Sequence, residues 1–194
     1  MKIQFLGAAR TVTGSKHLII TNDGKKILLD CGFFQGKGSE TDGLNREFNF
    51  DPSEIDYLIL SHAHIDHSGN LPNLVKQGYE GHIFATHATA DLASVMIQDS
   101  GHIQESDAEY INKKRAQHGE PPVEPLYTKE DAERVAGMFG GVNYAEPFEP
   151  IPGVSARLFD AGHILGSAGV SLEIEEKGKK IRLWFSGDIG RFKL

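Results

Sequence analysis

Residues 57–67 read Tyr-Leu-Ile-Leu-Ser-His-Ala-His-Ile-Asp-His, so an apolar run leads directly into four side chains that can bind metal ions. A continuous apolar run of this length is typical of a strand that is buried on both faces. Because alternate residues of an extended segment point to the same side, we expect His62 and His64 to converge on one point. Asp66 and His67 come where the chain should turn into a helix, and they can face a second point nearby.

The chemistry of these four side chains indicates a metal site. Neutral imidazole and carboxylate are ligands that borderline divalent metals such as zinc prefer. Four polar groups at the end of an apolar strand would be hard to satisfy by hydrogen bonds alone. We therefore predict that His62, His64, Asp66 and His67 are metal ligands.

Two later stretches repeat the arrangement of a strand that ends in a candidate ligand. His163 follows residues 158–162, and Asp188 follows residues 183–187. In both, a glycine directly precedes the candidate and lets the backbone turn tightly. Alone, such a histidine or aspartate is more often an ordinary surface, core or turn residue, but beside the histidine-rich stretch both are predicted to be ligands. Asp30 ends another strand and is a candidate acceptor that fixes a histidine ring, although a strand-end hydrogen bond explains it nearly as well.

The composition sets limits on the class of protein. The chain has 194 residues and is 39% hydrophobic, which is enough for one domain or for a large part of a bigger one. Its net charge of −7 argues against general electrostatic binding of nucleic acid by this chain alone, but it leaves open a site where bound cations reverse the local sign. The single cysteine, Cys31, excludes a disulfide framework and fits a reducing compartment. Without a signal-peptide or membrane-spanning pattern, the expectation is a cytoplasmic protein that does not bind membranes.

The hydrophobic patterning predicts a layered α+β fold. Strands are expected over residues 2–7, 17–20, 26–30, 55–61, 82–85, 154–159, 169–174 and 180–186. The sequence Asn22-Asp23-Gly24 is a hairpin signal between two of them. Helices are expected over 68–78, over 89–118 with a break near 100–101, and over 128–139 with Thr128 as the N-cap and Asp131 three positions on. Residues 31–50 are expected to form a long loop.

Taken together, these motifs resemble the metallo-β-lactamase superfamily. The segment 62–67 matches its signature, and Asp30, Gly162-His163 and Ser186-Gly187-Asp188 match the other motifs in order. Within the superfamily the chain is similar to the β-CASP branch of RNA-processing nucleases. The residues that carry this second resemblance are 5–15, 29–32, 161–168 and 185–191, together with a helical insert that contains 98–100 and 125–128.

The resemblance implies an αββα sandwich of which residues 1–194 form the N-terminal part, with a helical insert. In that family the β-CASP cap and the rest of the lactamase domain follow the motif that contains Asp188. That remainder carries one more metal-binding histidine and a histidine proposed as general acid. We therefore expect both the cap and the C-terminal part of the lactamase domain to be absent from this chain.

The resemblance also implies a site with two divalent ions, for which Zn2+ is the expected metal. His62, His64 and His163 would hold the first ion, Asp66 and His67 the second, and Asp188 would bridge them. A hydroxide between the ions would attack an RNA phosphodiester, Asp66 would orient it as the catalytic candidate, and the RNA would be gripped mainly by the cap.

Two other functions stay open. The first is a different hydrolase on the same fold, such as a thioesterase, a lactonase or a β-lactamase, because the metal site suits all of them. The second is a non-catalytic module in which an incomplete metal site binds one ion or binds loosely. The native metal, the choice between endo- and exonuclease, and association into a homo-oligomer are also left open.

Overall fold

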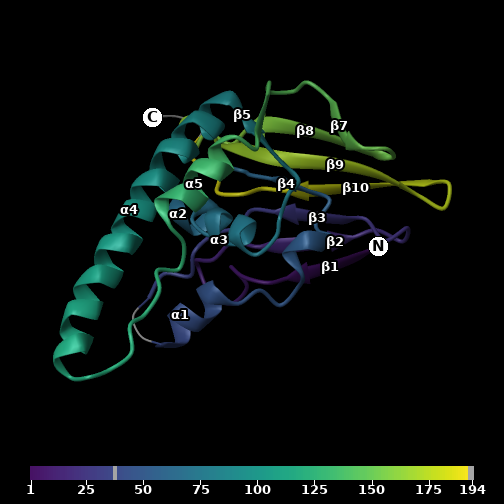
Figure 1. Ribbon diagram of the computed structural model, residues 1–194. Helices are drawn as coiled ribbons and strands as arrows, with labels where there is room; N and C mark the ends of the chain where they lie inside the picture. The colour runs from purple at the N-terminus through teal and green to yellow at the C-terminus, as the bar shows by residue number, and fades with distance from the viewer. Residues whose placement is uncertain (37–38, 192–194) are drawn as a thin grey trace.

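The computed structural model describes residues 1–36 and 39–191, which form two β-sheets packed face to face with helices over the outer face of one sheet (Figure 1). The larger sheet has the strand order β1-β2-β3-β4-β5-β6, and the smaller one has the order β10-β9-β8-β7. The predicted α+β class is therefore confirmed, with a helical layer, a mixed sheet and an antiparallel sheet.

The larger sheet contains β1 (Lys2–Phe5), β2 (His17–Ile20), β3 (Lys26–Leu29), β4 (Tyr57–Ile59), β5 (His82–Thr86) and β6 (Phe139–Val142). The smaller sheet contains β7 (Phe148–Ile151), β8 (Val154–Asp160), β9 (Ala168–Glu176) and β10 (Lys179–Phe185). The helices are α1 (Ser39–Arg46), α2 (Ile65–Ser68), α3 (Leu71–Lys76), α4 (His87–Gln117), α5 (Lys129–Ala136) and a 3-10 turn at Pro52–Glu54. Among the described residues, no helix has both the length and the apolar character that crossing a bilayer requires.

The central strand β4 is buried on both faces, as its apolar run predicts. Leu58 packs toward the helices, in a core that also holds residues of α3, α4 and α5. Tyr57 and Ile59 pack toward the smaller sheet. Each such side chain contributes about 1.5–3 kcal/mol when it is fully buried, so burial of alternate residues in two separate cores fixes the register of this strand.

The strand directions bring the candidate site residues to one edge. β3 pairs with β4 in parallel, with Leu29 opposite Ile59, and β4 pairs with β5 in parallel. Parallel strands end on the same side of a sheet. The residues that follow β3 and β4 therefore emerge together, which places Asp30 beside the start of the segment 61–67.

The outer face of the smaller sheet is open in the described part of the chain. Its strands alternate between buried residues that face the larger sheet and residues that face away. Trp184 of β10 lies on the open face and is 57% exposed. The described residues thus form three layers: helices, larger sheet and smaller sheet (Figure 1).

The prediction of a loop over 31–50 is wrong, because α1 forms within it. The segment is polar and contains Gly43, so its local pattern gives little helical signal. Tertiary contacts supply the missing stabilisation: the side chain of Asn45 bonds both the backbone N–H and the carbonyl of Phe34, each at 2.9 Å. An ion pair between Arg46 and Asp42 adds support within the helix.

The predicted break near 100–101 is also wrong, because α4 runs without interruption from His87 to Gln117. Gly101 is buried, and a Cβ atom there would lie 2.9 Å from the Cα of Lys129 at the start of α5. The glycine therefore permits a close approach of two helices.

Other predicted helices differ from the observed ones in their boundaries, or are divided in two. The expected helix 68–78 is two short helices, α2 and α3, so Asp66 and His67 lie within the first turn of a helix. The expected helix 128–139 ends at Ala136, and its last expected residue, Phe139, begins β6. The strands β6 and β7 were not predicted. The capping role of Thr128 is confirmed, since its side chain accepts from the N–H of Asp131 and the Asp131 carboxylate accepts from the N–H of Thr128. The hairpin turn at Asn22-Asp23-Gly24 is confirmed as well.

Replacing Gly101 by alanine tests the close approach of α4 and α5. In an exposed helix interior this change stabilises by about 1 kcal/mol. Here the added methyl group meets backbone atoms of the neighbouring segment, so we expect a net loss of about 1–2 kcal/mol in the free energy of unfolding. Urea unfolding measures it, with Ser106→Ala on the exposed face of α4 as control. A Gly101→Ala protein more stable than wild type would contradict the packing.

Candidate metal centre

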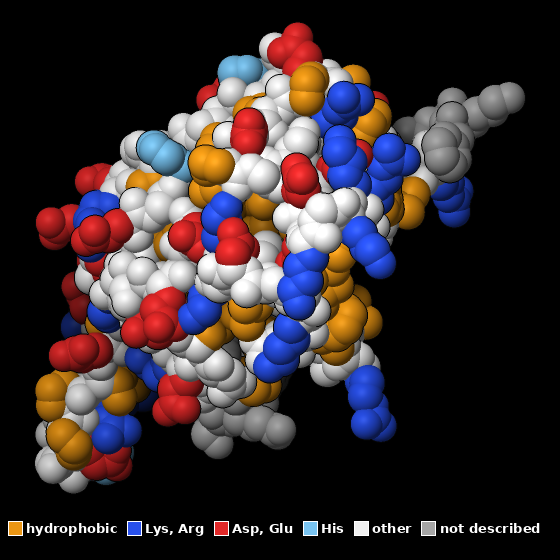
Figure 2. Space-filling model, turned by 90° about the vertical axis from the view of Figure 1, so that its right-hand side faces the viewer, with side chains coloured by type: hydrophobic (Ala, Val, Ile, Leu, Met, Phe, Trp, Pro, Cys, Tyr) orange, Lys and Arg blue, Asp and Glu red, His pale blue; other side chains and the backbone are white. Residues whose placement is uncertain are grey.

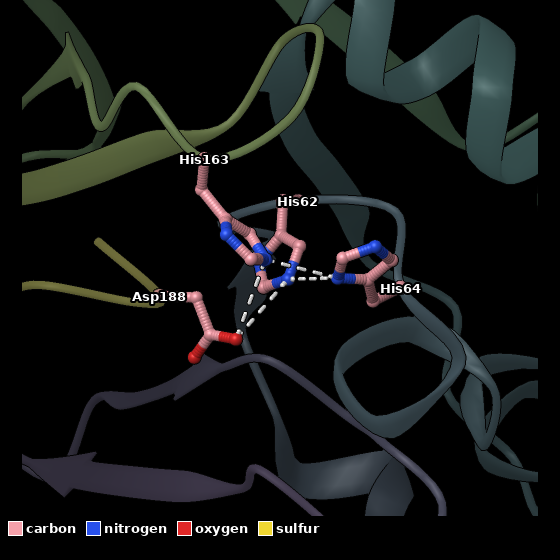
Figure 3. Close-up of side chains that lie close together, drawn as sticks. All are labelled: His62, His64, His163 and Asp188. Atoms are coloured by element: carbon pink, nitrogen blue, oxygen red, sulfur yellow. Dashed lines mark hydrogen bonds and ion pairs between the residues drawn. The ribbon is translucent and has the colours of Figure 1, made fainter. Parts of the chain in front are cut away.

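Six candidate ligands come together at the edge where β4, β8 and β10 end. His62 and His64 follow β4, and Asp66 and His67 lie in α2. His163 follows β8. Asp188 follows β10, so Asp188 and His163 both come from the smaller sheet and lie opposite His64 (Figure 3).

The tight turns before His163 and Asp188 are present as the sequence indicates. Gly162 has a φ of 65° and Gly187 has a φ of 53°, in the left-handed region that favours glycine. These turns aim the two side chains back toward the end of β4. Candidate ligands from segments far apart in the sequence can therefore meet at one point.

Three imidazole rings and one carboxylate point toward one another (Figure 3). The Nδ1 atom of His64 lies 3.1 Å from Nε2 of His62 and 3.1 Å from Nε2 of His163. The Oδ2 atom of Asp188 lies 3.5 Å from Nε2 of His163 and 4.0 Å from Nε2 of His62. In these four residues, one donor atom from each lies within 4.8 Å of all the others.

These distances fit a tetrahedral metal site. Zinc–nitrogen bonds of about 2.0–2.1 Å place the ligand atoms of such a site about 3.3 Å from one another. Each 3.1 Å pair can share one proton as an N–H···N hydrogen bond, and Nδ1 of His64 faces Nε2 of both other rings. The same donor set of neutral imidazoles and a carboxylate is spaced closely enough to hold one cation.

A second group of donors lies beside the first. The Nε2 atom of His67 lies 3.4 Å from Oδ1 of Asp188 and 4.0 Å from Oδ2 of Asp66. The two oxygens of Asp188 therefore face different partners: Oδ2 faces the rings of His62 and His163, and Oδ1 faces the ring of His67. This is the geometry of a carboxylate that can bridge two ions. The side chain of Asp188 remains 46% exposed, so the pair of groups is open to solvent on that side.

Asp30 lies beneath this arrangement and is fully buried. Its carboxylate accepts hydrogen bonds from Nδ1 of His67 at 2.6 Å and from the hydroxyl of Ser15 at 3.0 Å. It also accepts from the backbone N–H and the hydroxyl of Ser61, at 2.8 and 2.9 Å. The prediction that Asp30 fixes a histidine ring agrees with the bond to His67, which leaves Nε2 of that ring facing Asp66 and Asp188.

Burial and neighbouring charges set the protonation of the histidines. Burial, with a further contribution from the charge of His67, lowers the pKa of His62 to about 4, so His62 is neutral and able to bind metal. Burial also acts to lower the pKa of His67, but the hydrogen bond and the charge of Asp30 outweigh it and the net pKa is raised. For Asp30, burial raises the pKa, while the bond to His67 and its charge oppose it and leave the pKa below its usual value.

Ser15 and Ser61 contact residues of the candidate centre, although no local pattern in the sequence marks them. Ser61 also lies 3.0 Å from Nδ1 of His62, so its hydroxyl touches both a candidate ligand and Asp30. Ser15 is the last residue of the segment 5–15, which carries part of the family resemblance. The backbone N–H of Ser15 donates to the carbonyl of Asp66 at 2.8 Å, which ties this segment to α2.

A groove of about 610 Å3 opens beside His163. It is lined by the start of α4, by residues after β6 and by the turn that carries His163. Leu165 on that turn is 76% exposed, and the ring of Tyr144 forms part of the wall while its hydroxyl donates to the carbonyl of Ser167. The groove gives a substrate room next to the candidate ligands.

Comparison with known proteins places these motifs in a family. The metallo-beta-lactamase superfamily matches residues 11–169. The chain is 36% identical to Ribonuclease TTHA0252 of Thermus thermophilus, over 98% of this chain and 38% of that protein. It is 33% identical to Cleavage and polyadenylation specificity factor 73 of Drosophila melanogaster, over 98% of this chain and 25% of that protein. The chain thus spans well under half the length of these curated relatives.

Solved structures support the fold. A metallo-beta-lactamase of Cronobacter sakazakii with a HARLDQ motif superposes with a TM-score of 0.52, covering 94% of this chain and 54% of that one. The two sequences are 17% identical, so this likeness concerns the fold alone.

Removing the charge of Asp30 tests its structural role. In metal-free protein we expect Asp30→Asn to lower the free energy of unfolding by about 3 kcal/mol, because the change breaks a buried ion pair with His67 and misdirects two hydroxyl donors. Asparagine tolerates the φ of 58° at this position, so backbone strain is not introduced. Urea unfolding measures the loss, with Asp107→Asn on the exposed face of α4 as control. Equal stability of Asp30→Asn and wild type would refute the role.

Proposed function

The chain belongs to the metallo-β-lactamase superfamily, and from that premise we propose that its clustered histidines and aspartates bind two divalent ions and cleave RNA phosphodiester bonds. The resemblance to the β-CASP RNA-processing nucleases is confirmed by the ribonuclease and cleavage-factor relatives. The observation that carries the proposal is the meeting of three imidazoles and one carboxylate within 4.8 Å. The same proposal treats residues 1–194 as the N-terminal part of a lactamase domain that a cap and a C-terminal part complete.

The residues divide between two ions. His62, His64 and His163 would hold the first, and the Oδ2 atom of Asp188 faces the same point. Asp66 and His67 would hold the second, together with the Oδ1 atom of Asp188. Neutral imidazoles and carboxylates favour Zn2+ among the common divalent metals.

Bound divalent ions supply Lewis acidity and lower the pKa of bound water to about 7. The protein's own residues set the geometry in which this chemistry can act. Asp30 holds the ring of His67, and the hydroxyl of Ser61 lies against Nδ1 of His62, so both rings are fixed before substrate binds. Asp66 is the candidate catalytic residue, because its carboxylate lies beside His67 and can accept a hydrogen bond from the attacking water.

The charge of the chain is compatible with an RNA substrate. Two divalent ions would outweigh the two carboxylates of the donor set, so the loaded centre would be positive and would attract a phosphodiester. Charge is also unevenly spread over the surface, because Figure 2 shows lysine and arginine side chains gathered along one side of a face and acidic side chains mostly on the other. The cap is proposed to bind the remaining nucleotides of the RNA. The protein is proposed to act in the cytoplasm.

The rival hydrolase functions gain no specific support. The likeness to lactamase structures rests on a shared fold at 17% sequence identity. The relatives that match nearly the whole chain at 33–36% identity carry names of RNA-processing proteins. RNA cleavage is therefore the function that these relatives favour.

Metal analysis tests the two-ion arrangement. We expect the wild-type chain to bind about two equivalents of Zn2+ and Asp188→Asn to bind one or fewer, because Asp188 faces both donor groups. Plasma mass spectrometry after removal of free metal gives the content, and Asp107→Asn should keep both equivalents. Two tightly bound equivalents in Asp188→Asn would show that this carboxylate is not shared.

Loss of one imidazole tests the reaction. In the full-length enzyme we expect cleavage of single-stranded RNA, and we expect His64→Ala to abolish it, since His64 contacts both other imidazoles of the first group. His102→Ala, on the exposed face of α4, should cleave as wild type does. The readout is the release of labelled fragments, with and without a chelator. Undiminished cleavage by His64→Ala would reject the assigned centre.

A further inference from the structure

A second candidate site lies away from the metal centre, between α1 and the start of β2. It is a cavity of about 270 Å3 that shares no residue with the candidate ligands. Its walls are formed by Leu6, Lys16, Phe34, Gly43, Leu44, Glu47, Phe48, Asn49 and Phe50. The cavity therefore combines apolar and polar wall groups, with Lys16 as the one basic side chain among those that line it.

The basic side chain is Lys16, which is only 3% exposed. Its Nζ atom lies 4.9 Å from the ring centre of Phe48 and 5.4 Å from that of Phe34, and both rings line the cavity. Among the described residues, no carboxylate lies within 4.0 Å of this Nζ atom, and Glu47 at the cavity is farther away than that. A nearly buried ammonium thus lies in the wall of this cavity, and no carboxylate of the described residues pairs with it.

The surroundings compensate only part of the cost of burying this charge. Cation–π attraction to two rings is weaker than the desolvation of an ammonium group. The thiol of Cys31, the other titratable group that acts on Lys16, is neutral, because burial raises its pKa to about 12. Burial accordingly lowers the pKa of Lys16. An anion that enters the cavity would restore the missing pairing.

We propose that this cavity binds a small aromatic carboxylate, with its carboxylate on Nζ of Lys16 and its ring among Phe34, Phe48 and Phe50. The volume is slightly below the 300–1,000 Å3 common for ligand pockets, so it suits a single ring. The wall offers aromatic faces that pack well against another ring. The lining offers one cationic donor and also carries Glu47, so a monoanion fits better than a phosphate dianion.

The probe is benzoate, with two partial analogues that separate its features. Benzamide keeps the ring and removes the charge, and acetate keeps the charge and removes the ring. On the wild-type chain we expect saturable binding of benzoate with a Kd on the order of 1 mM, and at least tenfold weaker binding of both analogues. Calorimetric titration and the shift of the unfolding temperature measure it.

Two variants locate the binding. Lys16→Met removes the charge and should abolish benzoate binding, while Lys113→Met on the exposed face of α4 should bind as wild type does. Leu44→Trp should also abolish it by filling the cavity from α1 while leaving Lys16 in place, which keeps the test informative if Lys16→Met folds poorly. The proposal is overturned if benzoate shows no saturable binding, if benzamide binds as well as benzoate, or if either folded cavity variant binds as wild type does.

Discussion

The carboxylate of Asp30 is the interaction on which the rest of the site depends. It lies at the end of β3 and accepts hydrogen bonds from Ser15, Ser61 and His67, which belong to three other segments. A buried carboxylate is tolerated only when its oxygens are paired. Here the pairing couples the stability of the fold to the position of a candidate ligand, because a shift of any of these segments would leave a charge unsatisfied.

The donor atoms above Asp30 lie at distances that suit coordination. Nδ1 of His64 lies 3.1 Å from Nε2 of His62 and from Nε2 of His163, and burial keeps His62 neutral. Metal binding would add bonds to this folded arrangement, so the free energy of binding would also stabilise the fold. The arrangement needs strands from both sheets, since Asp188 reaches the centre from the end of β10 and His62 from the end of β4. The two sheets must therefore pack in register before the centre exists.

The sequence predicted those features that a local pattern encodes. The apolar run of β4 indicated burial on both faces, and the pairs Gly162-His163 and Gly187-Asp188 indicated tight turns at strand ends. Features that depend on distant contacts were missed. Helix α1 owes its stability to the bonds between Asn45 and Phe34, and the role of Gly101 comes from the approach of α5. Likewise, nothing local marks Ser15 and Ser61 as partners of one buried carboxylate, because that carboxylate lies on another strand.

The most direct test of the account is the position of metal in crystals of the chain grown with Zn2+, measured by anomalous diffraction at the zinc absorption edge. The account predicts two peaks, one bonded to His62, His64 and His163 and the other to Asp66 and His67, with the carboxylate of Asp188 between them. Anomalous peaks confined to surface histidines, with the rings of His62, His64 and His163 bonded to no ion, would contradict it.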